Sequence, residues 1–313
     1  MRIGIDLMGG DFAPRATTLG SVLAKNNLPA DVQLVLIGDQ EQILPILAES
    51  GASPSDFDLI HTSEVIEMGE HPAKAFSKKP ESSIGLGFKL LKEGKLDGFA
   101  SAGNTGAMLV GSMFTVNVVP GILRPAICAT IPQLDGGVAV LLDVGINADC
   151  KPEVLLQYAI IGSIYAEKVL HIDQPRVSLL NIGSEEEKGN ILAKTSHEAM
   201  KNNPSIHFIG NIEGNELLNS KADVIVCDGF TGNVVLKQAE GFYATMRKRG
   251  IQDSFFDRFN FENYGGTPIL GVNATVVIGH GISNEIAIKN MILQTYEVAR
   301  AQFVKRINET FQS

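Results

Sequence analysis

The 313-residue sequence contains no tryptophan and only three cysteines, Cys128, Cys150 and Cys227. The cysteines are far apart, and none belongs to a Cys-x-x-Cys pair, so the sequence offers no metal or redox motif of that spacing. Apolar residues lie beside two of them, with Ile127 and Ala129 on either side of Cys128 and Val226 before Cys227. They are therefore expected to be buried, reduced thiols in a protein of a reducing compartment.

Several nucleotide-binding and hydrolase motifs are also absent. The sequence contains no G-x-x-x-x-G-K-[ST] and no G-x-G-x-x-G after its first strand, so the usual signatures of ATP and dinucleotide sites are missing. It contains neither H-E-x-x-H nor G-x-S-x-G, which removes the simplest zinc-protease and serine-hydrolase interpretations.

The charge balance is acidic. The formal net charge of −9 argues against nucleic acid as a partner that binds across the whole surface. With 44% hydrophobic and 19% charged residues, the composition is typical of a globular protein. We expect one catalytic domain over residues 1–313. An arrangement of two lobes around one cleft is the alternative. The start, MRIGIDLMGGD, lacks the apolar core and cleavage site of an export signal, so a cytoplasmic location is expected.

One long stretch, residues 98–123, carries no charged residue at all. A membrane span requires about 18 or more apolar residues, but polar residues and glycines occupy both ends of this stretch, and only about a dozen between them are continuously apolar. The pattern therefore predicts a strand over 98–101, a turn over 101–106 and a buried helix over 107–116.

Strand and helix patterns alternate along most of the chain, which predicts a three-layer α/β/α fold with a mostly parallel, mixed sheet. Helix starts are indicated at Pro14, at Pro152, and at Ser184 with Glu187 as a capping box. Apolar residues from Ile288 to Phe311 recur every three or four positions and predict one amphipathic final helix. Strands are predicted over 2–7, 32–37, 58–61, 98–101, 126–131, 137–142, 176–181, 206–209, 223–227 and 274–278.

Polar and glycine residues follow five of these strands. In an α/β sheet such exits share the carboxyl edge, where ligands bind, so we expect the five loops to face one crevice. Glycines permit close approach to a ligand, and free N–H groups at a helix start attract anions. The candidate phosphate-binding turn consists of Ser101, Gly103, Asn104, Thr105 and Gly106, and the candidate cleft-lining residues are Asp6, Gly9, Gly10, Asp11, Asp143, Asn147, Asp228, Gly232 and His280.

Alternative interpretations of these residues stay open. The glycines and Asn104 could serve only to make tight turns. His280, in Gly-His-Gly after a strand, could be structural or part of the site. Asp6, Asp11, Asp143 and Asp228 could together bind a divalent metal, but capping and turn roles are more ordinary, and no metal is assigned.

The sequence resembles the PlsX family, the acyl-(acyl carrier protein):phosphate acyltransferases of bacterial phospholipid synthesis. The resemblance rests on nine blocks in the family's order, which together cover nearly the whole chain: IDLMGGDFAP, SAGNTGA, GILRPAI, LLDVGIN, LLNIGSEEEKGN, GNIEG, DVIVCDGFTGNVVLK, YGGTPILGV and GHGIS. It implies transfer of a long-chain fatty acyl group from acyl carrier protein to inorganic phosphate, with acyl phosphate as product. It also implies a homodimer whose fold is similar to the isocitrate and isopropylmalate dehydrogenases and phosphotransacetylase.

Such a reaction needs an anion site, a donor for the developing oxyanion and exclusion of water, whereas a cofactor, a metal and an acyl-enzyme are unnecessary. The resemblance implies Lys188 as a cation near the phosphate and Asn233 as an amide donor. On spacing alone, Lys188 would be a solvated lysine and Asn233 a cap or turn residue.

Docking of an acidic carrier protein to an acidic enzyme requires a local basic surface. The candidates are Lys237, Arg247, Lys248, Arg249 and Arg258, in a segment rich in aromatic residues. A solvated helix face and weak peripheral contact with an anionic membrane are the alternatives. Residues 241–263 form a more compact segment than the family pattern has, which weighs against membrane contact.

Two other functions stay open at this point. A metal- and NAD-dependent dehydrogenase of related fold would need a cofactor fingerprint that the sequence lacks. A noncatalytic scaffold that binds acyl carrier protein would keep the basic and aromatic segment but would tolerate loss of Lys188 and Asn233.

Overall fold

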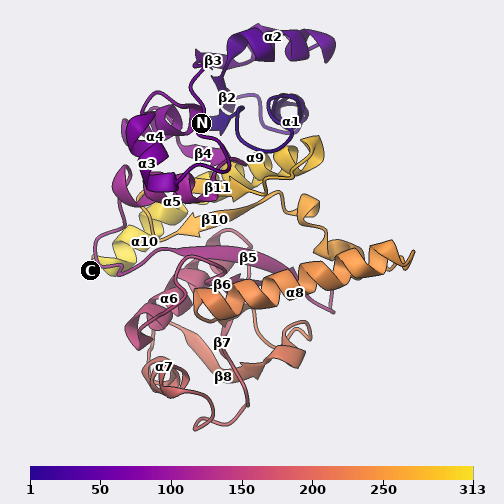
Figure 1. Ribbon diagram of the computed structural model, residues 1–313. Helices are drawn as coiled ribbons and strands as arrows, with labels where there is room; N and C mark the ends of the chain where they lie inside the picture. The colour runs from indigo at the N-terminus through magenta and orange to yellow at the C-terminus, as the bar shows by residue number, and fades with distance from the viewer. Residues whose placement is uncertain (313) are drawn as a thin grey trace. The chain divides into compact units, whose positions relative to one another are not determined.

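The computed structural model describes residues 1–312, which form two compact units. Unit 1 comprises Met1–Val118 and Phe261–Arg300, and unit 2 comprises residues 119–260 and 301–312. Each unit has its own group of hydrogen-bonded strands with helices packed against them (Figure 1).

In unit 1 the strand order is β3-β2-β1-β4-β11-β10, and neighbouring strands are parallel except for β10, which is antiparallel to β11. The strands are β1 (Arg2–Asp6), β2 (Gln33–Gly38), β3 (Asp58–His61), β4 (Gly98–Ser101), β10 (Gly266–Leu270) and β11 (Thr275–Gly279). The helices are α1 (Arg15–Lys25), α2 (Gln40–Glu49), η1 (Pro54–Asp56), α3 (Pro72–Lys78), α4 (Ser83–Lys92), α5 (Thr105–Phe114), η4 (Phe261–Asn263) and α9 (Glu285–Arg300).

Alternate residues of the central strands of unit 1 face opposite layers of helices. Ile3 and Ile5 of β1 are completely buried in a cluster that includes Ile288 of α9. On the other face, Phe99 of β4 packs edge-on against Phe88 of α4, with ring centroids 5.3 Å apart. Because both faces are covered, the central strands read as nearly continuous apolar runs, and their ends are the places where polar groups can collect.

In unit 2 the strand order is β5-β6-β9-β7-β8. β5 and β6 form an antiparallel hairpin, and the remaining pairs are parallel. The strands are β5 (Ala126–Pro132), β6 (Val138–Leu142), β7 (Arg176–Asn181), β8 (His207–Glu213) and β9 (Val224–Val226). The helices are α6 (Pro152–Lys168), α7 (Ile191–Lys201), η2 (Gly214–Glu216), α8 (Gly229–Lys248), η3 (Phe256–Phe259) and α10 (Phe303–Phe311).

The predicted fold class is confirmed, because the strands are mixed with parallel pairs in the majority and helices cover them. Every predicted strand overlaps an observed one. The prediction omitted β10, whose short apolar run contains Pro268 and follows Gly265 and Gly266. These residues are typical turn signals, but pairing with β11 imposes the extended conformation.

Two helix predictions were wrong. The final helix is not continuous: α9 ends at Arg300, Gln302 adopts a left-handed conformation with φ of 51°, and α10 begins at Phe303. Phe303 packs edge-on against Tyr165 of α6, with ring centroids 5.6 Å apart, so a tertiary contact within unit 2 fixes the second helix. The capping box at Ser184 and Glu187 does not start a helix either, since these residues form turns and α7 begins at Ile191.

The uncharged stretch of residues 98–123 forms β4, the loop after it and α5, a helix of ten residues. Among residues 1–312, none of the helices combines the length and the apolar character that are needed to cross a bilayer.

Candidate active site

The first site group in unit 1 joins the ends of β1 and β4, which lie side by side in the sheet. Asp6 is buried, and its carboxylate accepts a hydrogen bond from the Ser101 hydroxyl at 2.6 Å and from the Met8 N–H at 2.9 Å. The Ser101 oxygen accepts in turn from the Gly103 N–H at 2.9 Å. Burial raises the pKa of the Asp6 carboxyl, while the hydrogen bond from Ser101 opposes that shift. Ser101 therefore holds the turn in place.

Asn104 caps α5 and also fastens a second loop. Its side-chain oxygen accepts from the Ala107 N–H at 3.0 Å. Its amide nitrogen donates to the carbonyl oxygens of Glu67, Met68 and Glu70 at 3.0, 3.3 and 3.0 Å. The side chain is buried and its hydrogen-bonding capacity is used within the chain.

The first two backbone N–H groups of α5 are unpaired among the described residues. Within the part of the chain that the structure describes, the N–H groups of Thr105 and Gly106 have no hydrogen-bond acceptor. They occupy the first two positions of the helix, where such groups are ordinarily unpaired and where the helix dipole favours negative charge. If residues 101–106 bind phosphate, these backbone groups are better placed to do so than the side chain of Asn104.

Replacing Asn104 with alanine should lower the free energy of unfolding by about 2 kcal/mol, because a helix cap and the attachment of residues 67–70 are lost together. Urea unfolding followed by circular dichroism measures this. Asn104→Ser keeps a capping oxygen but cannot reach the distant carbonyls, so about half of the loss should be recovered. An alanine variant as stable as the unmodified protein would contradict this role.

The loops after β1 and β11 meet as well. The Asp11 N–H donates to the carbonyl oxygen of Gly281 at 2.8 Å. A side chain at Gly9 would collide with the Asp6 carboxylate and the Gly103 backbone, which explains the glycine there. The His280 ring packs against the Phe261 ring, with ring centroids 5.1 Å apart. This contact is compatible with a structural role and with a site role for His280. Unit 1 thus brings together three of its strand exits.

In unit 2, Asp143 organises the loop after β6. The carboxylate is completely buried and accepts from the N–H groups of Ile127, Ile146 and Asn147 at 3.0, 3.3 and 2.7 Å. It also accepts from the side-chain amide of Asn147 at 3.0 Å, and that amide lies 2.7 Å from the Tyr158 hydroxyl. Asp143 and Asn147 therefore fix the conformation of the loop through buried hydrogen bonds.

The loop after β9 packs directly on this network. Asp228 caps α8 by accepting from the Thr231 N–H at 2.8 Å and from the Thr231 hydroxyl at 2.9 Å. The Gly229 N–H donates to the Asn147 carbonyl oxygen at 2.7 Å. A side chain at Gly232 would collide with the carbonyl oxygen of Asp143, so glycine permits the first turn of α8 to lie against the loop after β6.

Asn233 lies in the first turns of α8 and faces the same loop. Its amide nitrogen donates to the Val144 carbonyl oxygen at 3.2 Å, beside Gly145. An amide nitrogen carries two hydrogens, and within residues 1–312 Val144 provides the acceptor for one of them. The side chain is half-buried and can offer a second N–H to a ligand.

Lys188 lies in the turn between β7 and α7 and is exposed. Its backbone is held in place, because its N–H donates to the Glu185 carbonyl oxygen at 3.2 Å and its own carbonyl oxygen accepts from the Asn181 amide at 3.1 Å. Among the described residues no carboxylate forms an ion pair with its ammonium group. Lys188 is therefore a free cation on a fixed turn.

A pocket of about 380 Å³, which the sequence analysis did not identify, lies beside this turn. Its walls come from the end of β7, the start of α7, the first turns of α8 and Leu155 of α6. Leucine, isoleucine, alanine and valine make up half of the lining residues, and Asn181, Asn190, Asp228 and Thr231 are the polar members. The adjacent apolar residues Leu179 and Leu180 had indicated a strand, and only the packing of three helices shows that a pocket lies beside them.

The alternative roles of the aspartates and cysteines can be compared with these contacts. Within residues 1–312 no group of three or more His, Cys, Asp or Glu side chains is arranged to hold a metal ion. The cysteines are free thiols, as expected; Cys128 and Cys227 are buried, whereas Cys150 is only partly buried. Burial raises the pKa of all three, that of Cys150 to about 11, so they are weak nucleophiles near neutral pH.

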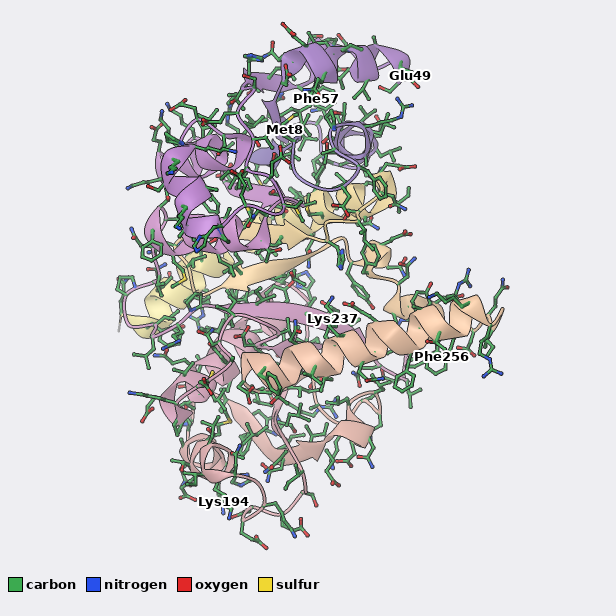
Figure 2. The ribbon with its side chains drawn as sticks, in the orientation of Figure 1. Met8, Glu49, Phe57, Lys194, Lys237 and Phe256 are labelled. Atoms are coloured by element: carbon green, nitrogen blue, oxygen red, sulfur yellow. The ribbon has the colours of Figure 1, made fainter. Side chains whose placement is uncertain are left out.

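The proposed docking residues differ in how far they are already paired. Lys237 pairs with Glu240 at 2.7 Å, and Arg247 with Asp257 at 3.3 Å. Arg258 donates to the carbonyl oxygens of Gln133 and Gly137, so it supports the β5–β6 hairpin. Nearby, Phe255, Phe256 and Phe259 form a ring cluster (Figure 2 labels Lys237 and Phe256). Lys248 and Arg249 form no ion pair within residues 1–312, which makes them the stronger docking candidates.

The two groups of strand exits belong to different units. Ser101, Gly103, Asn104, Thr105 and Gly106 are part of unit 1, whereas Asp143, Lys188 and Asn233 are part of unit 2. The expectation that all of them serve one substrate stays a prediction.

Similarity to known proteins shows both the fold and the family of the chain. The structure is similar to a phosphotransacetylase from Streptococcus pyogenes, with a TM-score of 0.67 and 17% identity over 95% of this chain and 94% of the other, so the fold class is that of the phosphotransacetylases. Residues 1–255 and 248–306 match the family described as Fatty acid synthesis protein.

Two relatives that carry the name phosphate acyltransferase match over the full length. The protein from Dictyoglomus turgidum is 40% identical over 99% of this chain and 97% of its own length. That from Heliobacterium modesticaldum is 43% identical over the same shares. The chain therefore belongs to the PlsX family of acyltransferases that its sequence blocks resemble.

Proposed function

We propose that this protein transfers a long-chain acyl group from the thioester of an acyl carrier protein to inorganic phosphate, giving acyl phosphate for phospholipid synthesis. The observation that carries the proposal is the full-length match to relatives named phosphate acyltransferase, one of which is 40% identical. The exposed, unpaired Lys188 and the free N–H capacity of Asn233 and of the α5 N-terminus support it.

In this reaction a phosphate oxygen attacks the thioester carbonyl carbon, and the carbonyl oxygen becomes an oxyanion. Collapse of that intermediate breaks the carbon–sulfur bond and releases the carrier thiolate, which takes up a proton. Phosphate is already largely ionised near neutral pH, so positioning and charge stabilisation contribute more than a strong base. Lys188 supplies positive charge to phosphate and carbonyl oxygens, and Asn233 donates to the oxyanion.

For the carrier protein, the proposal assigns docking to the end of α8 and the segment after it. Lys248 and Arg249 provide unpaired charge there, and the partly exposed Phe256 provides an apolar contact. The protein is proposed to act as a homodimer in the cytoplasm, and analytical ultracentrifugation tests the dimer. Weak contact with anionic membranes through the same segment stays a prediction, which flotation with anionic vesicles tests.

The decisive experiment incubates the purified protein with palmitoyl-acyl carrier protein in the presence and absence of phosphate. The expected result is phosphate-dependent loss of the thioester together with formation of acyl phosphate, trapped as the hydroxamate by hydroxylamine. Sulfate replaces phosphate in the control and should give no product. Thioester that persists at all phosphate concentrations would overturn the proposal and favour a scaffold that only binds the carrier, whereas hydride transfer to NAD would favour the dehydrogenase.

A further inference from the structure

We propose that the pocket in unit 2 between the end of β7 and the starts of α7 and α8 binds the hydrocarbon chain of the acyl substrate, and that Ala193 limits the chain length it accepts. This inference rests on the proposed function, because it supplies a binding site for the substrate of that reaction.

The position of the pocket is the first argument. Gly189 lines it and directly follows Lys188, while Asn181 lines it and donates its amide to the Lys188 carbonyl oxygen at 3.1 Å. On the other side Thr231 lines it, two residues before Asn233. The pocket is thus bordered by the chain segments that hold both proposed transfer residues. It lies at the carboxyl ends of the parallel strands β7 and β9, where α/β proteins bind ligands.

The chemistry of the walls is the second argument. Leu155 and Leu179 line it and are buried, and Leu192, Ala193 and Val235 contribute further aliphatic surface. A volume of about 380 Å³ falls in the ordinary range for small-ligand pockets. Among the described lining residues the one charged side chain is Asp228, whose carboxylate accepts from the Thr231 N–H and hydroxyl. The described lining has no lysine or arginine, so it suits an uncharged chain better than a phosphate or a nucleotide.

The rim provides a third argument. Ile182 lines the pocket and is 79% exposed, and Ile191, next to the lining residues Asn190 and Leu192, is 86% exposed. Exposed isoleucine side chains beside an apolar pocket extend its apolar surface, and extended apolar surfaces mark ligand-binding grooves. An acyl chain that enters across this rim would cover Ile182 and would continue the apolar surface inward.

Ala193 is the wall residue best suited to a test. It lies in the first turn of α7, where the Asn190 side chain caps its N–H at 2.8 Å, so its position does not depend on its own side chain. Leucine is as acceptable in a helix as most residues and would extend three further carbons into the pocket. Each methylene group of the acyl chain that loses its apolar contact lowers the affinity about fourfold. The substitution should therefore lower the affinity for long acyl chains more than that for short ones.

The experiment compares kcat/KM for octanoyl- and hexadecanoyl-acyl carrier protein. Ala193→Leu should lower the value for the longer chain by about tenfold or more and change the shorter by less than about twofold. Ala199→Leu, on the same helix but outside the pocket, is the matched control and should leave the ratio unchanged. Leu192→Ala enlarges the pocket and should shift the preference in the opposite direction.

A binding measurement separates this inference from the proposed function. The fluorescence of cis-parinaric acid, which rises in apolar surroundings, should show binding to the unmodified protein and to Ala199→Leu, and weaker binding to Ala193→Leu. If acyl phosphate forms but Ala193→Leu changes neither the chain-length ratio nor the binding of the probe, the inference is overturned and the proposed function stands. If no acyl phosphate forms, the proposed function fails, and the probe still decides whether Ala193 limits an apolar site.

Discussion

Replacing Lys188 with alanine should lower the rate of phosphate-dependent acyl transfer by about a thousandfold. The ammonium group forms no ion pair within residues 1–312, so its charge is available to the phosphate and to the developing oxyanion. The turn that carries it is fixed through backbone hydrogen bonds to Glu185 and Asn181, which the substitution leaves intact. Steady-state kinetics with palmitoyl-acyl carrier protein would show the loss mainly in kcat.

Two further variants make this result specific. Lys194→Ala removes an exposed lysine on α7 (Figure 2) and should keep nearly full activity. Lys188→Arg keeps the charge but changes its geometry, so part of the activity should return. Because Lys188 is exposed, thermal unfolding of all three variants should match that of the unmodified protein. Activity of Lys188→Ala within about threefold of the unmodified protein would remove this residue from the mechanism.

Replacing Asn233 with alanine should lower kcat by about a hundredfold, the typical cost of one lost oxyanion donor. One N–H of the amide donates to Val144, which orients the group, and the proposed mechanism uses the other for the reacting carbonyl oxygen. The loss should appear in kcat with little change in KM, because the bond to the oxyanion forms only as the reaction proceeds.

Asn233→Asp provides the sharper comparison. It keeps the shape of the side chain and places a negative charge near the start of α8, where the helix dipole tolerates it, yet it removes both N–H donors. This variant should be as inactive as the alanine variant while remaining folded. Val234→Ala, at the next and exposed position of α8, controls for a general effect on the helix and should be active. An active Asn233→Asp enzyme would exclude a donor role.

The sequence predicted much of the fold because its strands are apolar and its helices amphipathic, and both patterns are local. It also indicated residues that the structure brings together at strand exits. Asp6, Ser101 and Gly103 form one bonded group. Asp143 is bonded to Asn147, Asp228 is bonded to Gly232, and Gly232 packs against the carbonyl oxygen of Asp143. Glycines and short polar residues at these points are required by local backbone geometry, so a single sequence is enough to indicate them.

Other features depend on partners distant in the chain. Asn104 looked like a phosphate ligand, but its amide is used by the carbonyl oxygens of residues 67–70, about 35 positions earlier. Arg258 looked like a docking residue, but its guanidinium supports Gln133 and Gly137 of the hairpin. In both cases a polar side chain satisfies backbone carbonyl groups that no local pattern could have identified.

By itself, the sequence determined the family, the alternation of strands and helices, and the glycine-rich turns, because each depends on residue type and short-range spacing. The tertiary structure decided where the last helix breaks, which polar side chains are already bonded, and that an apolar pocket lies beside Lys188. The physical reason is that hydrogen-bond satisfaction and cavities depend on the packing of segments far apart in the chain, whereas backbone propensity depends only on neighbouring residues.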